Sequence, residues 1–264
     1  MIVYNQEAYI EQALKGILMQ KTNFLFEIII GEDCSTDHTK QIIEKFATLY
    51  PDNIKPFYHP ENIGMMRNFT HTLNRCEGEY IAICEGDDYW IDEYKLAKQI
   101  EVLDANRDIM LSFHNTKCIN SRKKRIYNSN DGEADGSVFT IEDLLTRKWF
   151  IMTASIVFRN VFKDSYPNWF KRIRNGDMAL ELMLADKGNF IYTDKVMAVY
   201  RQHIHGASVS SLRIKRNRAL VKLLKLFNKH TGEEYNSLIL KRIRQFNWEL
   251  INMFKRKVKN SIPV

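Results

Sequence analysis

Three acidic side chains, Glu85, Asp87 and Asp88, fall within four positions, directly after the apolar run Tyr80–Cys84. Carboxylates this close repel one another, and a divalent cation would offset the repulsion. Carboxylate oxygens suit hard ions such as Mg²⁺ or Mn²⁺, which proteins commonly hold with one or two carboxylates together with substrate phosphates. Local sequence leaves a second interpretation open, in which the segment is an acidic surface turn and Asp88 caps the next helix.

Other candidate residues stand at the ends of further expected elements. Asp33 follows a second apolar run, Phe26–Ile30, and Asp177 stands at the start of an expected helix. Each also has a purely structural explanation, because Asp33 suits a turn and an acid in the first turn of a helix is favoured by the helix dipole. His203 follows a strand-like segment, so it is either a surface histidine or a metal or phosphate partner at the same edge of the fold.

The first ninety residues alternate between short apolar runs and segments with helical periodicity. We expect strands at residues 1–3, 26–30, 54–59 and 80–84, and helices at residues 7–19, 39–49 and 66–75. This alternation predicts an α/β layer with a mostly parallel sheet. Ligands bind at the carboxyl ends of strands in such sheets, so Asn5, Asp33 and the acidic segment should converge at one edge.

The second half of the chain is less regular. We expect helices at residues 95–106, 140–147 and 177–187, strands at 109–114, 156–159, 190–193 and 196–200, and a polar loop at 128–136. The last fifty residues predict two amphipathic helices, 211–230 and 237–257. The first of these carries Leu220, Leu223, Leu224 and Phe227 at helical spacing.

Composition indicates a globular protein with a real core. The chain has 264 residues, of which 45% are hydrophobic and 27% charged, enough for one large domain or a domain with an appendage. No apolar run approaches the roughly 18–20 residues that span a bilayer, and no secretory pattern is visible at the N-terminus. The four cysteines are scattered without a CxxC pair, which argues against a zinc site or disulfide framework and favours a cytoplasmic location.

Positive charge is concentrated at the C-terminal end. Residues 212–264 hold 14 Lys/Arg and three Asp/Glu, whereas residues 1–211 hold 25 Lys/Arg and 29 Asp/Glu. Because a nucleic-acid binder would carry its positive charge across the body, we expect no nucleic-acid partner. Two interpretations of the basic helices stay open: peripheral docking on anionic lipid at the inner face of the membrane, or packing on the preceding domain.

A set of motifs follows one another in a fixed order and spacing. These are Tyr4-Asn5-Gln6-Glu7, residues 27–37, Asn62-Ile63-Gly64 with Arg67-Asn68, residues 85–88, Thr153-Ala154-Ser155, Gly176-Asp177, and Tyr200-Arg201-Gln202-His203. Taken together they resemble glycosyltransferase family 2, whose members have the GT-A fold and are inverting transferases that use nucleotide-sugar donors. The resemblance covers about residues 1–210.

The resemblance implies a domain organisation. It predicts an α/β GT-A fold, a Rossmann-like, mostly parallel sheet flanked by helices, with a C-terminal helical extension. The catalytic domain would cover residues 1–210, with a nucleotide-binding half over about 1–110 and an acceptor half over about 111–210. Residues 211–264 would form the basic amphipathic tail.

The resemblance also implies roles for single residues. Asp177 would be the general base, and a DXD-like motif would hold Mn²⁺ or Mg²⁺ through Asp88, Asp87 and His203. Asp33 would accept a hydrogen bond from the nucleotide base. The residues implied to bind the donor are Tyr4, Asn5, Glu7, Asp33, Arg67 and Asp87.

The implied activity is metal-dependent, inverting transfer of a sugar from a UDP- or GDP-type donor to a glycan or lipid-linked acceptor. Such chemistry would serve the synthesis of bacterial surface polysaccharide or glycolipid. Two alternatives stay open. One is a non-catalytic sugar-nucleotide or glycan-binding protein with a truncated GT-A fold, since the first strand is only Met1–Val3. The other is a nucleotidyltransferase, because a similar α/β layout does not fix function.

Overall fold

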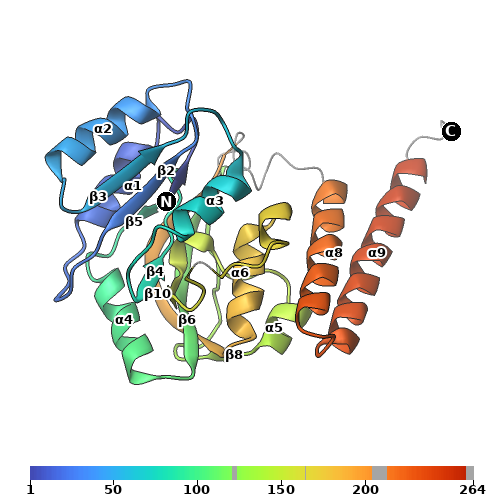
Figure 1. The fold of residues 1–264 in the computed structure, drawn as a ribbon. Coiled ribbons are helices and arrows are strands. Elements are labelled where there is room, and N and C mark those ends of the chain that lie inside the picture. The colour runs from blue at the N-terminus through green and yellow to red at the C-terminus, as the bar shows by residue number, and fades with distance from the viewer. Residues whose placement is uncertain (121–123, 164, 204–212, 260–264) are drawn as a thin grey trace.

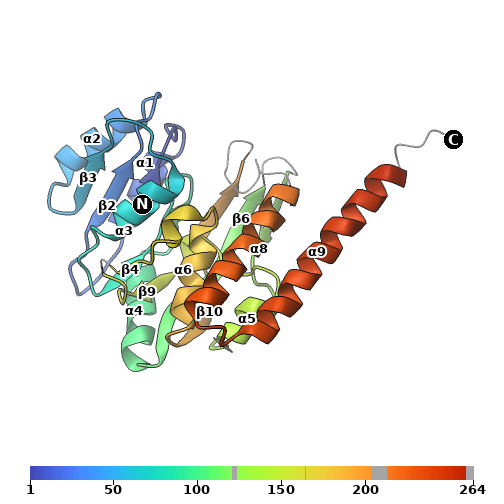
Figure 2. The same ribbon diagram turned by 45° about the vertical axis from the view of Figure 1, so that its right-hand side comes forward.

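The structure is a computed structural model that describes residues 1–120, 124–163, 165–203 and 213–259. Helices and β-sheets form layers in which the N-terminal sheet lies at one end and the C-terminal helices at the other (Figures 1 and 2). This arrangement confirms the predicted α/β class with a C-terminal helical region. The domain boundary predicted near residue 210 falls within residues 204–212, which lie outside the described part of the chain.

The N-terminal sheet is parallel and has the strand order β1-β2-β3. Its strands are β1 (Ile2–Val3), β2 (Ile28–Glu32) and β3 (Ile54–Tyr58), and its helices are α1 (Ile10–Leu18), α2 (Thr39–Leu49) and α3 (Met65–Leu73). Every residue of β2 is buried, because this central strand is covered on both faces. A continuous apolar run is typical of such a strand, which is why the sequence predicted it well.

The second sheet is mixed and has the order β4-β9-β6-β10-β5, with β7 paired to β6 and β8 to β10. Its strands are β4 (Tyr80–Ala82), β5 (Tyr89–Trp90), β6 (Ile109–Asn120), β7 (Arg125–Asn128), β8 (Val138–Phe139), β9 (Val157–Arg159) and β10 (Asn189–Gln202). Only β6 and β10 pair in parallel, and the other described pairings in this sheet are antiparallel.

Two features of the second sheet differ from the sequence-based expectation. Strand β4 pairs antiparallel with β9 instead of extending the N-terminal sheet, because its partner arrives from much later in the chain. The two strands expected at 190–193 and 196–200 are one long strand, β10, with a shift in register between Thr193 and Ala198. Such an irregularity bends a strand while keeping it in the sheet.

The remaining helices cover the second sheet and extend away from it. They are α4 (Lys95–Ala105), α5 (Ile141–Thr146), α6 (Gly176–Ala185), α8 (Arg213–His230) and α9 (Asn236–Lys259), with short 3₁₀ turns at Thr153–Ser155 and Phe170–Arg172. Helices α8 and α9 lie side by side, and α6 contacts α8 (Figure 2). Within the part of the chain that the structure describes, no helix has both the length and the apolar character needed to cross a bilayer.

The apolar faces of α8 and α9 belong to the larger hydrophobic core. Leu223, Leu224 and Phe227 of α8 are fully buried, and Ile239 and Phe246 of α9 are nearly so. They share one cluster with buried residues of α6 and of strands β6 and β10. Packing of these helices on the rest of the fold, one of the two interpretations open from the sequence, is therefore observed.

This packing predicts that the C-terminal helices contribute to the stability of the whole chain. Leu224→Ala should lower the free energy of unfolding by about 2–5 kcal/mol, because it removes a fully buried side chain and leaves a cavity. Leu240→Ala is the matched control, since Leu240 is 43% exposed, and should change it by less than about 0.5 kcal/mol. Urea unfolding followed by circular dichroism measures both, and equal effects would contradict the packing role.

Candidate active site

A cavity of about 1820 Å³ lies between the ends of β1 and β2, the turn after β4, the start of α6 and the C-terminal helices. Pockets for one small ligand usually measure about 300–1,000 Å³, so this cavity has room for two substrates. Four acidic residues from three separate segments line it: Asp33, Glu85, Asp87 and Asp177. The fold therefore brings the predicted acidic segment and the predicted base into one space.

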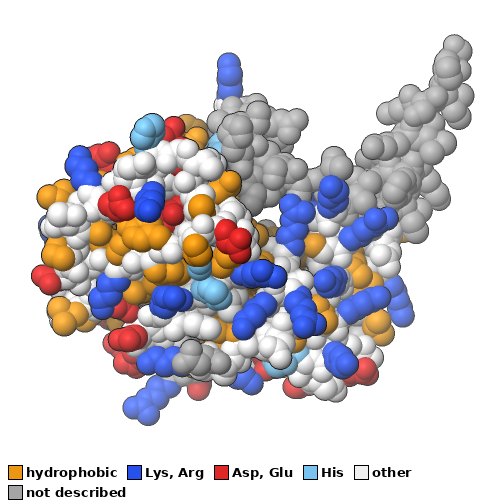
Figure 3. Space-filling view, turned by 45° about the horizontal axis from the view of Figure 1, so that its top comes forward, with side chains coloured by type: hydrophobic (Ala, Val, Ile, Leu, Met, Phe, Trp, Pro, Cys, Tyr) orange, Lys and Arg blue, Asp and Glu red, His pale blue; other side chains and the backbone are white. Residues whose placement is uncertain are grey.

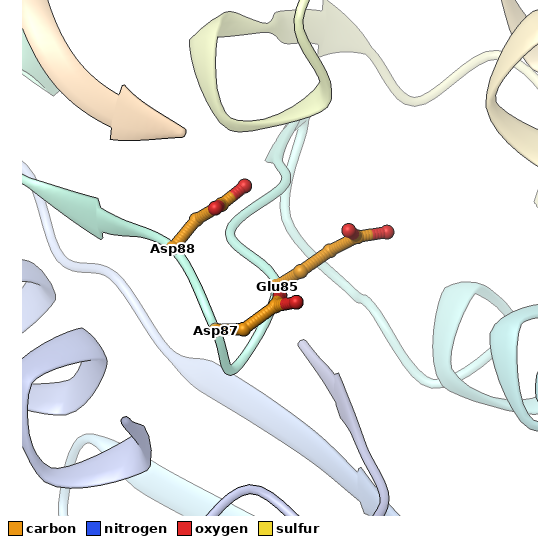
Figure 4. A group of neighbouring side chains, drawn as sticks. All are labelled: Glu85, Asp87 and Asp88. Atoms are coloured by element: carbon orange, nitrogen blue, oxygen red, sulfur yellow. The ribbon is translucent and has the colours of Figure 1, made fainter. Parts of the chain in front are cut away.

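The acidic turn, which we define as residues 85–88, presents a compact group of carboxylates. Ligand atoms of Glu85, Asp87 and Asp88 all lie within 4.8 Å of one another. Figure 4 shows the three side chains pointing to the same side of the loop between β4 and β5. The backbone N–H of Asp88 donates to the Glu85 carbonyl oxygen at 3.1 Å, which closes the turn.

Gly86 allows the acidic turn to pack against the end of β1. A Cβ atom at this position would lie 2.0 Å from Gln6 Oε1 and 2.6 Å from Val3 Cγ1, so no larger residue fits without displacing its neighbours. Gln6 Oε1 is itself buried and has no hydrogen-bond partner among the described residues. The short first strand thus forms one wall of the site.

Asp88 is fully buried at the back of the acidic turn. Its Oδ1 accepts a hydrogen bond from the backbone N–H of Arg201 at 2.8 Å, whereas Oδ2 finds no partner in the described structure. Burial, followed by repulsion from Asp87 and Glu85, raises the pKa of Asp88 well above its ordinary value. A buried carboxylate oxygen without a partner is costly, and a divalent cation bound among the three carboxylates would satisfy it.

Glu85, the first residue of the acidic turn, lines the cavity that helix α6 also borders. Burial, and then the charges of Asp87 and Asp177, raise the pKa of Glu85 to about 8, while the N-terminal ammonium group opposes the shift. Because Asp177 contributes to this shift, the two acidic sites lie within electrostatic reach of each other. Such crowding of like charges is typical of sites that bind cations.

Arg201, near the end of β10, holds the acidic turn in place. Its guanidinium donates to the Asp87 carbonyl oxygen at 2.7 Å and to the Gln12 side chain, and it stacks on the rings of Tyr9 and Tyr89. The sequence alone predicted no role for this residue. Its place two positions before His203 in the motif Tyr200-Arg201-Gln202-His203 offered a signal.

His203 reaches the acidic turn through Asp87. Its Nε2 lies 2.9 Å from Asp87 Oδ2, and its ring packs on Tyr9 with ring centroids 4.9 Å apart. The compact group of ligand atoms consists of Glu85, Asp87 and Asp88. The third metal ligand predicted from the sequence was His203, and Glu85 takes that place in the group. His203 Nδ1 is buried and has no partner among the described residues, so this nitrogen remains available to a ligand.

Asp177 begins helix α6 and lines the same cavity. Its Oδ1 accepts a hydrogen bond from the Met178 backbone N–H at 2.8 Å, which orients the carboxylate, and burial raises its pKa. Gly176 permits close approach of α3, since a Cβ there would lie 2.7 Å from Met66 Sδ. A carboxylate with a raised pKa in a cavity suits proton abstraction near neutral pH.

Asp33 lies on the cavity wall with both carboxylate oxygens already engaged. They accept hydrogen bonds from the backbone N–H groups of Ile63 at 2.8 Å and Gly64 at 3.0 Å. Asp33 is only 3% exposed, and Gly64 has a φ of 87°, which favours glycine. The carboxylate thus fixes the loop that leads into α3.

Tyr4 and Asn5 line the cavity as predicted donor-binding positions. Asn5 has a φ of 53°, a left-handed conformation that asparagine tolerates. Its side-chain Oδ1 accepts from the Thr36 backbone N–H at 2.8 Å, and its own N–H donates to Ser35 Oγ at 3.0 Å. The loops after β1 and β2 are therefore tied together at the cavity.

Two predicted donor-binding residues are not among the residues that line the cavity. Glu7 accepts a hydrogen bond from the His38 backbone N–H at 2.9 Å and pairs with His38 Nδ1 at 2.7 Å, which joins the segment before α1 to the start of α2. Arg67 is exposed on α3. The neighbouring Asn68 faces inward and donates to the Gly31 carbonyl oxygen at 2.8 Å.

Comparison with known proteins relates the chain to a family. The family model described as Glycosyl transferase family 2 matches residues 1–205. The uncharacterized protein Rv1520 of Mycobacterium tuberculosis is 39% identical over 213 residues, which are 78% of this chain and 58% of the relative. The putative teichuronic acid biosynthesis glycosyltransferase TuaG of Bacillus subtilis is 35% identical over 110 residues, 42% of each protein. The chain thus spans less than two thirds of the length of these relatives.

Solved structures share the fold at low sequence identity. S. aureus TarS 1-349 in complex with UDP-GlcNAc has a TM-score of 0.69 and 21% identity, covering 94% of this chain and 71% of that chain. The mannosyltransferase PcManGT from Pyrobaculum calidifontis, in complex with GDP-Man and Mn²⁺, has a TM-score of 0.61 and 15% identity, covering 100% and 74%. At these identities the likeness establishes the fold alone.

The crowded carboxylates predict a stability that depends on pH when divalent cations are removed. The folded-state pKa of Glu85, about 8, lies above its ordinary 4.5, so folding favours the protonated form. The contribution of Glu85 is therefore complete below pH 4.5 and is lost as the pH rises through about 8. We expect urea unfolding in a chelator to show stability falling over this range, and Glu85→Gln to flatten the fall. An unchanged slope in the variant would contradict this assignment.

Proposed function

The chain belongs to glycosyl transferase family 2, with the GT-A fold that its sequence predicted, and we propose that it transfers a sugar from a nucleoside-diphosphate sugar to an acceptor hydroxyl with inversion at the anomeric carbon. One observation carries the proposal. A single cavity is lined by Glu85 and Asp87, two members of the three-acid cluster that the buried Asp88 completes, and by a separate acid, Asp177, at the start of α6.

The acidic turn is suited to the donor diphosphate. Glu85, Asp87 and Asp88 would hold Mn²⁺ or Mg²⁺, and the unpartnered Oδ2 of Asp88 fits such a ligand. When bound, the cation supplies charge neutralisation for the departing nucleoside diphosphate. TarS was solved with UDP-GlcNAc, and PcManGT with GDP-Man and Mn²⁺, which supports a donor of this class here.

Backbone and side chains around the acidic turn would bind the nucleoside. Tyr4 and Asn5 line the cavity beside the turn, and Asp33 holds the 62–64 loop against the same space. His203 fixes the orientation of Asp87 through its Nε2 and keeps Nδ1 unpartnered among the described residues, so this nitrogen is open to a group of the donor. These groups would position the donor before the reaction begins.

Asp177 would remove the proton from the acceptor hydroxyl as that oxygen attacks the sugar. Burial raises the pKa of Asp177 toward the working pH, and the Met178 backbone N–H holds the carboxylate in one orientation. A single displacement inverts the configuration at the anomeric carbon. Such a step requires one base and no second carboxylic acid, which matches the presence of one acid on the α6 side of the cavity.

We place this activity in the synthesis of bacterial surface polysaccharide or glycolipid, on the cytoplasmic side of the membrane. The name of the relative TuaG, a putative teichuronic acid biosynthesis glycosyltransferase, supports the polysaccharide. The four cysteines are all free, which suits a reducing compartment. The family match favours sugar transfer over the nucleotidyltransferase alternative, and the complete acid set favours an enzyme over a binding protein.

The proposed base predicts a specific pattern for Asp177→Asn. Transfer should fall by at least about 10²-fold, because general-base catalysis commonly contributes 10²–10⁴-fold. Binding of UDP or GDP with Mn²⁺ should stay within about twofold of the wild type, since Asp177 belongs to the acceptor side. Product formation across a panel of nucleotide sugars, together with isothermal titration, measures both, and near-normal transfer by the variant would exclude Asp177 as the base.

The proposed cation site predicts a different pattern for Asp88→Asn, in which both transfer and donor binding are affected. Asp88→Asn should abolish transfer and also remove the Mn²⁺-dependent gain in UDP or GDP affinity, because it alters the buried member of the carboxylate cluster. Asp52→Asn is the matched control, since Asp52 is an exposed acid outside the cavity, and should behave as the wild type. Titrations with Mn²⁺ and with a chelator separate the two conditions. Retained Mn²⁺ dependence in a folded Asp88→Asn protein would overturn the cation site.

A further inference from the structure

The cavity continues past Asp177 to a second wall formed largely by α8 and α9. Six basic side chains line this part, and one of them, Arg242, donates hydrogen bonds to the carbonyl oxygens of Thr146 and Arg147. We call the other five the basic wall: Lys148, Arg174, Arg216, Lys241 and Arg244. All five are exposed, and none makes a hydrogen bond or ion pair with another described residue. The cavity therefore holds positive charge without a partner among the described residues as well as carboxylates.

The basic wall is distinct from the basic outer surface of the same helices. Lys and Arg side chains gather over the C-terminal helices in Figure 3. Arg216 lines the cavity, whereas Arg218 and Lys225 of the same helix are exposed but do not line it. A solvated helix face explains Arg218 and Lys225 without a ligand. Positively charged side chains that line a cavity next to a candidate base favour a negatively charged ligand.

A buried donor adjoins the basic wall. Asn217 of α8 is 2% exposed and lines the cavity, yet its Nδ2 has no hydrogen-bond partner among the described residues. An amide N–H₂ left without an acceptor in a buried position costs free energy, so an acceptor atom from a ligand would stabilise it. This observation is independent of the charges and points to the same place.

Phosphate is the anion that these groups fit. Guanidinium groups present paired N–H donors that match phosphate oxygens, and Arg174, Arg216 and Arg244 supply three such groups. Trp149 and Trp248, which line the same part of the cavity, offer exposed ring faces against which sugar rings can pack. The combination suits a ligand in which sugars and phosphates alternate or adjoin.

We propose that the acceptor of this enzyme carries phosphate groups, and that the basic wall binds them while the acceptor hydroxyl reaches Asp177. This inference rests on the proposed function and names the substrate class of its acceptor side. Arg174 stands three residues before Asp177, so the basic wall begins next to the proposed base. The donor diphosphate has its own cation site among the carboxylates of the acidic turn, which leaves the basic wall for the second substrate.

A membrane surface fits these observations less well. Basic side chains that dock on lipid lie on an outward face, as the exposed Arg218 and Lys225 do. The members of the basic wall line a cavity of about 1820 Å³ that also contains four carboxylic acids. Anionic headgroups pressed against this cavity would meet that negative charge. A chain-like acceptor can place its phosphates at the basic wall and its hydroxyl at Asp177.

Binding of phosphate probes to the intact chain tests the proposal. In a chelator at low salt, the wild type should bind a hexamer of poly(glycerol phosphate) or inorganic tripolyphosphate, and should bind neutral maltohexaose far more weakly. Arg216→Ala/Arg244→Ala should weaken phosphate binding at least about tenfold, because two charge-assisted contacts are removed. Arg218→Ala/Lys225→Ala is the matched control with the same loss of charge, and should stay within about twofold. Isothermal titration measures affinity, and circular dichroism confirms folding.

The probes also distinguish two sources of phosphate. Tighter binding of the hexamer places the phosphates in the glycan chain as diesters, and tighter binding of tripolyphosphate places them in a diphosphate linkage; either supports the proposal. Equal affinities in the two double variants, or equal binding of maltohexaose, would overturn it. So would loss of binding to phosphatidylglycerol vesicles in Arg216→Ala/Arg244→Ala with phosphate binding unchanged, since the basic wall would then be a membrane surface.

The inference and the proposed function fail in different ways. If the wild type releases no nucleoside diphosphate from any nucleotide sugar in the presence of Mn²⁺, the proposed transferase activity fails. If it does so but both double variants bind the phosphate probes equally, only the assignment of the acceptor fails. The first measurement uses the donor side alone, and the second uses no donor.

Discussion

The burial of Asp88 is the constraint on which the rest of the site depends. A carboxylate with no exposure, next to two further acids, needs compensation from its surroundings. The backbone N–H of Arg201, 113 residues away in the chain, supplies one hydrogen bond, and the Arg201 side chain holds the carbonyl of the same turn. Strand β10 must therefore end beside the acidic turn, which aligns the second sheet with the first and brings His203 to Asp87.

The cavity separates charge in a way that suits two substrates. Carboxylates lie at the strand ends, where the proposed cation and donor diphosphate would neutralise each other, and basic side chains lie along α8 and α9. Asp177 stands between them at the start of α6. Both ends depend on packing: Gly86 admits the acidic turn against β1, and the buried apolar faces of the C-terminal helices fix the basic wall. These helices thus have a structural role as well as the proposed role in binding.

Much of this organisation could be predicted from the sequence because its signals are local. Apolar runs predicted the N-terminal parallel strands, since a strand covered on both faces has apolar residues throughout. The crowding of Glu85, Asp87 and Asp88 indicated a cation site from three adjacent charges alone. The order of the motifs indicated glycosyltransferase family 2, and the family match over residues 1–205 confirms it. A role for Asp177 as base stays a prediction.

The sequence by itself determined which acids are present, which runs form the buried strands, and which helices have an apolar face to pack. Only the tertiary structure decided which side chains meet. It placed Arg201 on the acidic turn, turned Glu7 toward His38 and left Arg67 outside the cavity. It also paired β4 with β9 and decided which basic side chains line the cavity and which do not. The physical reason is that periodicity reports which residues are buried, whereas contacts between distant segments depend on register and packing that no local pattern encodes.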